Sequence, residues 1–389
     1  YTNNPAWCFY DLVTNSRYGL GEYIPGAWVD KAALYTIGRY CDAVNDSGTY
    51  IGVPDGKGNI EPRFTCNLYL QNQEEAYKVI QNMASIFRAM LYWLGGVVTP
   101  VMDKPESVWA QFTNADVVDG IFTYQGSANR ARHTVALVTW NDKNERFKQK
   151  IEYVEDTAGI NRYGVNQIEI PAMGCTSRGQ AHRLGKWVLY SERLETEVIT
   201  FKASLKGISL LPGKIINTMD QFRSGARNGG RIISSTNTSI TIDAPITIPL
   251  GTCTVDMEIP DGTLVTRTLT NAEGSTNVLT WTSELNTQPI NGSIWMLSET
   301  SLVPETWRVL SITEDSDNLY TINAVAHNTS KFDFIEQDIK LVIQPTSIYT
   351  DITKVDSIKN PIRSDSIYKL SNDTIATRIH VSWEAVKGV

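Results

Sequence analysis

The sequence has 389 residues, enough for roughly two to four domains, with 42% hydrophobic and 20% charged residues. This composition is typical of a folded chain and excludes global disorder. A net charge of −7 and a pI near 5.3 argue against a protein that coats nucleic acid, which needs a basic face to neutralise phosphates. The longest apolar run, residues 84–98, is interrupted by polar residues and glycines, so neither a membrane-spanning helix nor a signal peptide is predicted.

The first 41 residues are rich in aromatic residues and glycine, which fits short helices joined by turns best. A turn at residues 55–59 precedes an alternating, strand-like pattern over residues 64–70. The clearest helix follows, because apolar residues recur at spacings of three and four from Ala76 to Leu94. Asn72 is its candidate N-cap, and Gly95-Gly96 are expected to end it before a strand at residues 97–102.

From residue 131 the pattern becomes β-rich, with one further predicted helix at residues 178–194, capped by Thr176 or Ser177. The strands expected in this half cover residues 133–140, 150–154, 197–203, 239–242, 264–269, 307–312 and 320–325. Beyond Asp220 the short, Thr- and Ser-rich strands predict a separate barrel- or sandwich-like module over residues 224–343, with helices confined to the first 220 or so residues.

The last part of the chain is polar and contains two prolines, so residues 344–369 are expected to be a protease-sensitive linker. Residues 376–383 are predicted to be the first strand of a new β-sandwich. Because the chain starts at Tyr1 and stops just after this strand, we expect a fragment of a longer protein.

Few residues indicate chemistry. The four histidines have no metal-ligand spacing, and the sequence contains neither a nucleophile-elbow motif nor a phosphate-binding loop, so no catalytic, cofactor-binding or metal residue is predicted. The five cysteines lack Cys-x-x-Cys spacing and are expected to be reduced and mostly buried, as in a protein made in a bacterial-type cytosol.

Two acidic groups remain as possible acid–base pairs of a hydrolase, although we interpret both as solvated faces. They are Glu152, Glu155 and Asp156, and Glu192, Glu195 and Glu197. The 17 tyrosines and 10 tryptophans would suit a carbohydrate-binding surface, but their scatter along the chain is more typical of core and interface residues. The residues alone therefore indicate an acidic, multi-domain α+β protein without a recognisable active site.

Several segments resemble the tip attachment (host specificity) protein J family of lambda-like siphophages, in order and spacing over about residues 4–340. The opening residues 4–12 and the Arg17-Tyr18-Gly19-Leu20-Gly21 run resemble the family's first block, and residues 87–93 its next. Pro212-Gly213 with Asp220 and residues 230–232 resembles a third block, in which Lys214 replaces the family's usual Asp. Residues 307–312 and 320–328 fit the last block.

The resemblance implies a non-enzymatic baseplate hub at the tail tip that forms the end of the tail tube for host attachment and DNA ejection. Its implied domains are an α/β hub domain (1–130), an α+β hub β-barrel part (131–222), an all-β domain (223–343), and a linker with a truncated fibronectin-III-like start (344–389). It also implies virion localisation after synthesis in the bacterial cytoplasm, and no cofactor. The implied partners are two further copies in a homotrimer, other tail-tip and tail-tube proteins, genomic DNA passing through the lumen without specific binding, and a host receptor bound by missing C-terminal parts. A tail-associated cell-wall or polysaccharide hydrolase and a carbohydrate-binding module are the alternatives.

Overall fold

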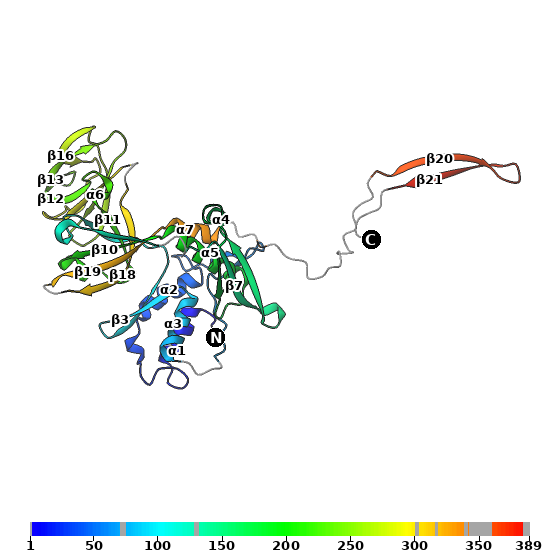
Figure 1. The fold of residues 1–389 in the computed structure, drawn as a ribbon, viewed down its shortest axis with the longest axis horizontal. Coiled ribbons are helices and arrows are strands. Elements are labelled where there is room, and N and C mark those ends of the chain that lie inside the picture. The colour runs from blue at the N-terminus through cyan, green and yellow to red at the C-terminus, as the bar shows by residue number, and fades with distance from the viewer. Residues whose placement is uncertain are drawn as a thin grey trace. The chain divides into compact units, whose positions relative to one another are not determined.

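The computed structural model describes residues 2–70, 75–127, 132–299, 303–315, 318–337, 341 and 360–383 (Figure 1). The chain divides into two compact units, Tyr1–Lys340 and Leu341–Val389. It is a mixed α+β protein in which strands outnumber helices, as predicted for its fold class.

The N-terminal part of the first unit packs helices against a hairpin. Its helices are α1 (Pro5–Thr14), α2 (Lys31–Cys41) and α3 (Ala76–Ile86), and its strands are β1 (Val53–Pro54), β2 (Ile60–Glu61), β3 (Ala89–Leu94) and β4 (Val97–Met102). The side chain of Asn4 caps α1 by accepting from the Ala6 N–H, and that of Asp30 caps α2 by accepting from the Ala33 N–H. Apolar side chains of all three helices share one core, in which Phe9 and Phe87 meet edge to face. Figure 1 shows α1, α2 and α3 grouped beside β3.

The prediction of one helix from Ala76 to Leu94 is wrong in its second half. Helix α3 ends at Ile86, Arg88 turns the chain with a φ of 56°, and residues 89–94 form β3. Gly95 and Gly96, with φ of 56° and 85°, make the two-residue turn between β3 and β4 and do not end a helix. Positive φ at both turn residues matches the twist of paired strands, so this pair of glycines favours a hairpin. The candidate cap Asn72 lies outside the described residues.

Residues 64–70, which were predicted to form a strand, do not form one. This segment is anchored one bond at a time: the Phe64 N–H donates to the Cys41 carbonyl, that of Cys66 to Asn3, and that of Asn67 to Gly174. Alternate side chains of this segment are buried, but its backbone bonds to three separate segments and not to a neighbouring strand.

A three-stranded sheet lies against the longest helix. Its order is β8-β7-β9, with bounds Lys148–Glu155, Val135–Asp142 and Gln167–Pro171, and α4 (Thr157–Tyr163) joins β8 to β9. Helix α5 (Arg178–Leu194) packs on β7 and β8, and its bounds confirm the prediction. Ser177 is the cap, because its side chain accepts from the Gln180 N–H. Ala181 and Leu189 are buried under the sheet, while Leu184 and Val188 are only partly covered.

A six-stranded sheet forms the middle of the first unit. Its order is β5 (Val108–Thr113), β11 (Ile215–Met219), β18 (Glu305–Glu314), β19 (Tyr320–Ala326), β10 (Glu197–Ala203) and β6 (Thr123–Gly126). These strands come from three of the four predicted segments, so the predicted boundaries at 130/131 and 222/223 do not separate the sheets. The change in composition after Asp220 predicted a separate module, but strands on both sides of it share this sheet. β18 pairs with β11, and β19 pairs with β10.

A second six-stranded sheet is drawn only from residues after Asp220. Its order is β15 (Leu264–Thr268), β14 (Thr254–Glu258), β17 (Ile294–Ser298), β12 (Gly229–Ser235), β13 (Ser239–Ile248) and β16 (Gly274–Thr280). It surrounds its own apolar core, which includes Trp281 and Trp295. Helices are not confined to the first 220 residues, because α6 (Gln221–Ser224) and α7 (Ser330–Glu336) follow, and α7 packs on α5.

Gly213, one of the residues that carry the family resemblance, occupies a position that no other residue fits. Its φ is 83°, and a Cβ there would lie 1.9 Å from Cγ1 of Val101. Gly213→Ala should therefore lower the free energy of unfolding by about 2 kcal/mol or more, measured by denaturant unfolding. Gly225→Ala is the control: its φ is 72° but its Cβ would meet nothing within 4 Å, so only the backbone cost of about 1 kcal/mol is expected. Equal losses in the two variants would contradict the steric argument.

The second unit contributes one antiparallel hairpin, β20 (Ile362–Lys369) with β21 (Ile375–Ser382). The predicted linker at residues 344–369 is thus wrong in its last third, where β20 lies. Residues 344–359 are outside the described residues. The predicted final strand at residues 376–383 corresponds to β21.

Candidate functional site

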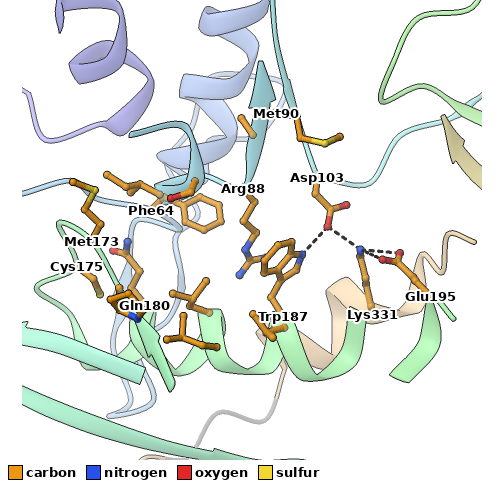
Figure 2. A pocket seen from close by; sticks show the side chains of 18 of the residues that line it. Phe64, Arg88, Met90, Asp103, Met173, Cys175, Gln180, Trp187, Glu195 and Lys331 are labelled. Atoms are coloured by element: carbon orange, nitrogen blue, oxygen red, sulfur yellow. Dashed lines mark hydrogen bonds and ion pairs between the residues drawn. The ribbon is translucent and has the colours of Figure 1, made fainter. Parts of the chain in front are cut away.

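A network of buried charges lies where α5, α7, the β3–β4 hairpin and the central sheet meet (Figure 2). Asp103, just after β4, accepts from the ammonium of Lys331 at 2.8 Å and from the indole N–H of Trp187 at 2.6 Å. Its other oxygen forms an ion pair with the guanidinium of Arg308, 2.6 Å away. Lys331 also donates to Glu195, at the end of α5, at 2.8 Å. One carboxylate thus connects strand β18 to helices α5 and α7.

The charges of this network balance. Two carboxylates, Asp103 and Glu195, face two cations, Arg308 and Lys331, and the Lys331 side chain is only 1% exposed. His327 is 3.2 Å from Glu195. Burial alone would raise the pKa of Asp103, but Arg308, Lys331 and the Trp187 N–H together hold that pKa below its usual value. The carboxylate is therefore kept ionised, and its contacts hold the neighbouring elements together.

The depressed pKa of Asp103 predicts a specific pH dependence. A carboxyl whose pKa is lower in the folded state stabilises the fold above its unfolded pKa, about 3.9, and loses that contribution as pH falls through the folded pKa. The difference in unfolding free energy between the wild type and Asp103→Asn should accordingly be constant from pH 5 to 7 and shrink below about pH 4. Denaturant unfolding across this range measures it. A difference that grows on acidification would contradict the assignment.

Arg183, on the buried face of α5, connects the helix to the N-terminal part. Its guanidinium donates to the carbonyls of Pro54 and Arg63 at 3.0 and 3.1 Å, and pairs with Glu61 at 2.8 Å. The side chain is 1% exposed. Arg63 in turn forms an ion pair with Glu336 on α7. These contacts and the Asp103 network hold α5 and α7 against the rest of the unit.

A cleft of about 390 Å³ lies beside the network. Arg88 crosses it with its guanidinium 4.9 Å from the ring centre of Phe64 and 5.2 Å from that of Trp187. Figure 2 shows Arg88 next to Trp187, with Met173, Cys175 and Gln180 lining the far side. Most of the remaining lining is aliphatic.

The two acidic groups singled out in the sequence do not behave as solvated faces throughout. Glu152 is buried against Arg178 and His182, at 2.5 and 3.1 Å, and Asp156 is buried against Arg193 at 2.6 Å. Glu195 belongs to the network above. Local sequence hides these pairs, because each partner lies 26 or more residues away and on another element.

The sequence also led to predictions about the histidines, metal sites, cysteines and membrane-spanning helices. His133 pairs with Glu192, and His327 with Glu195, so these two histidines serve as partners of carboxylates. Within the described residues, no group of three or more His, Cys, Asp or Glu side chains is arranged to hold a metal ion. All five cysteines are free. None of the described helices is both long enough and apolar enough to cross a membrane.

Known proteins that are similar to this chain are phage tail proteins. A family model described as a putative phage tail protein matches residues 75–234. A solved 43 kDa tail protein of prophage MuSo2 from Shewanella oneidensis is 10% identical to this chain, with a TM-score of 0.34, and the match covers 84% of this chain and 64% of that one. This part of the chain, residues 75–234, is therefore similar to phage tail proteins.

Within that class the similarity is specific. Tip attachment protein J of Escherichia phage SECphi27 is 33% identical over 396 residues, covering 99% of this chain and 32% of that protein. Its counterpart in Escherichia phage SECphi4 is 27% identical over 412 residues, covering 98% and 35%. These matches confirm the resemblance found in the sequence: the chain is similar to tip attachment protein J over nearly its whole length. It spans about a third of the length of these curated relatives.

Proposed function

We propose that this chain is a structural part of a phage tail tip, a baseplate hub that forms the end of the tail tube for host attachment and DNA ejection. The observation that carries the proposal is its similarity to tip attachment protein J over 99% of its length. The balanced, buried ion network is consistent with a structural role, because its pairs hold the elements that they join in one arrangement.

The finer features of the proposal follow from the family. The chain acts in the virion, after synthesis in the bacterial cytoplasm, as a homotrimer together with other tail-tip and tail-tube proteins. DNA passes through its lumen without specific binding, a role that the net charge of −7 favours because a basic lining would retain phosphate. Receptor binding belongs to other parts of the whole protein, since the chain spans about a third of the length of its curated relatives, and β20 and β21 belong to a fibronectin-III-like domain. The domain scheme 1–130, 131–222, 223–343 and 344–389 describes the hub modules in sequence order, although their strands intermix in the central sheet.

The proposal assigns no enzymatic activity to the chain. A hydrolase needs a pair of carboxyl groups free to exchange protons, whereas Glu152, Asp156 and Glu195 are each engaged by cations. A sugar-binding platform needs coplanar exposed rings, whereas the exposed pair Trp28 and Trp93 is nearly perpendicular, at 86°. These contacts favour the structural role over both alternatives.

The proposal is tested by labelling particles of the phage that encodes the chain. A short epitope is inserted between Asp261 and Gly262, in the exposed turn that joins β14 to β15. Antibody-bound gold should mark only the end of the tail distal to the head. Gold on the head or along the tail shaft would refute the role. A nonsense mutation in the gene should also give particles that do not adsorb to host cells, with adsorption restored by a plasmid copy.

A further inference from the structure

Arg88 is a buried arginine held in an unusual backbone conformation. It lies between α3 and β3 with a φ of 56°, and only 8% of the residue is exposed. Left-handed backbone is costly for a residue with a long side chain. Its backbone carbonyl accepts from the Asp103 N–H at 3.0 Å, which ties this turn to the ion network. The fold thus places the guanidinium in the cleft and keeps it there.

Among the described residues the Arg88 guanidinium has no carboxylate partner. It makes one hydrogen bond, to the Arg183 carbonyl at 3.2 Å, and its buried Nε has no partner. Asp103, whose charge acts on Arg88, is already engaged by Arg308 and Lys331. Burial lowers the pKa of Arg88 to about 10, so the group is still charged at neutral pH. By contrast, the buried Arg183 and Arg308 each have a carboxylate.

The cleft beside Arg88 has the size and lining of a binding site. Its volume of about 390 Å³ lies within the usual range for ligand pockets. Apolar side chains from α3, β3, β9, the loop after β9 and α5 line it, namely Ile86, Met90, Ile170, Met173, Leu184 and Val188. A buried cation among apolar side chains that line one cavity is complementary to a group that combines a carboxylate with an apolar side chain.

We propose that this cleft docks an acidic segment of a neighbouring tail protein, whose carboxylate pairs with Arg88 while an adjacent apolar side chain fills the cavity. The inference rests on the proposed function, since it names the kind of partner that a tail-tip component would bind. Charge complementarity selects the occupant: a neutral segment leaves the buried cation without an anion, and a basic one is repelled by it.

Two peptides that differ only in charge test the proposal on the purified chain, acetyl-Leu-Glu-amide and acetyl-Leu-Gln-amide. The acidic peptide should bind with roughly tenfold higher affinity, as expected for one charge-assisted hydrogen-bonded pair. Binding is followed by calorimetry up to about 10 mM, where a ligand with a Kd of 1 mM is nearly saturating. Arg88→Met should abolish the preference for the acidic peptide.

Because Arg88→Met removes a buried side chain and can impair folding, a second variant acts at the rim. Met90 lines the cleft and is 45% exposed, so Met90→Asp places a negative charge there without emptying the core. It should weaken binding of the acidic peptide at least tenfold, whereas Ile121→Asp, at an apolar residue that is 59% exposed and does not line the cleft, should leave binding unchanged.

Equal affinities for the two peptides, no binding of either at about 10 mM, or full binding by Met90→Asp would overturn the proposal. A second copy of this chain is the alternative occupant, and it would appear as self-association lost in Met90→Asp with no peptide preference. Gold at the tail tip together with any of these results would refute the docking cleft alone. Gold elsewhere on the particle would refute the proposed function whatever the peptides do.

Discussion

Replacing Lys331 with methionine should lower the free energy of unfolding by about 3–5 kcal/mol. The ammonium is 1% exposed and contacts both Asp103 and Glu195 at 2.8 Å. Methionine keeps the aliphatic stem but leaves two carboxylates in a buried site with one strong cation, Arg308. Removing one partner of a buried ion pair is costly because the remaining charge stays desolvated. Denaturant unfolding monitored by circular dichroism measures the loss.

The matched control is Lys202→Met on β10, whose lysine pairs with Asp315 on the surface. Both side chains of that pair are more than 40% exposed, so a change below about 1 kcal/mol is expected. The double variant Lys331→Met with Glu195→Gln should recover part of the loss, since it restores one carboxylate to one cation. Similar losses in Lys331→Met and Lys202→Met would show that the network contributes no more than a surface pair.

Arg183→Met should be destabilising to a similar degree, by about 3–5 kcal/mol. The guanidinium contacts Glu61 and donates to three backbone carbonyls, those of Pro54, Pro62 and Arg63. After substitution those carbonyls and the carboxylate lose their donor in a site that excludes water. The loss should appear in denaturant unfolding as a lower midpoint with little change in slope.

Arg267→Met serves as the control for this prediction. Arg267 on β15 also donates to backbone carbonyls, those of Thr266, Ser283 and Glu284, but these bonds are exposed to solvent. Water replaces the lost donor there, so a cost below about 1 kcal/mol is expected. If Arg267→Met cost as much as Arg183→Met, burial would not be the source of the effect.

Local signals in the sequence predicted individual elements well where tertiary contacts agreed with them. Helix α5 has a cap at Ser177 and an apolar stripe that packs on β7 and β8, so local and long-range preferences coincide. Local and long-range preferences conflicted at residues 87–94. The apolar residues there have a helical spacing, but the two glycines that follow form the turn of a hairpin. Pairing of β3 with β4 decided the outcome, because it satisfies the backbone groups that a helix would have satisfied.

The candidate site could not be derived from sequence for a simple geometric reason. Asp103, Glu195, Arg308 and Lys331 are separated by as many as 228 residues, and no motif marks any of them. The pairing of β18 with β11 and of β19 with β10, together with the packing of α7 on α5, brings them together. The family resemblance, in contrast, was readable because its blocks are short and keep their order along the chain.

The most direct test of the central claim is an electron-microscopy reconstruction of the tail tip of the phage that encodes this chain. We expect three copies in a ring that continues the tail tube, around a channel whose lining is neutral or negative. The acidic balance of the chain sets the expected sign, because DNA moves most freely where no lysine and arginine array replaces its counterions. A single copy per particle, density away from the tip, or a channel lined by a continuous basic stripe would contradict the account.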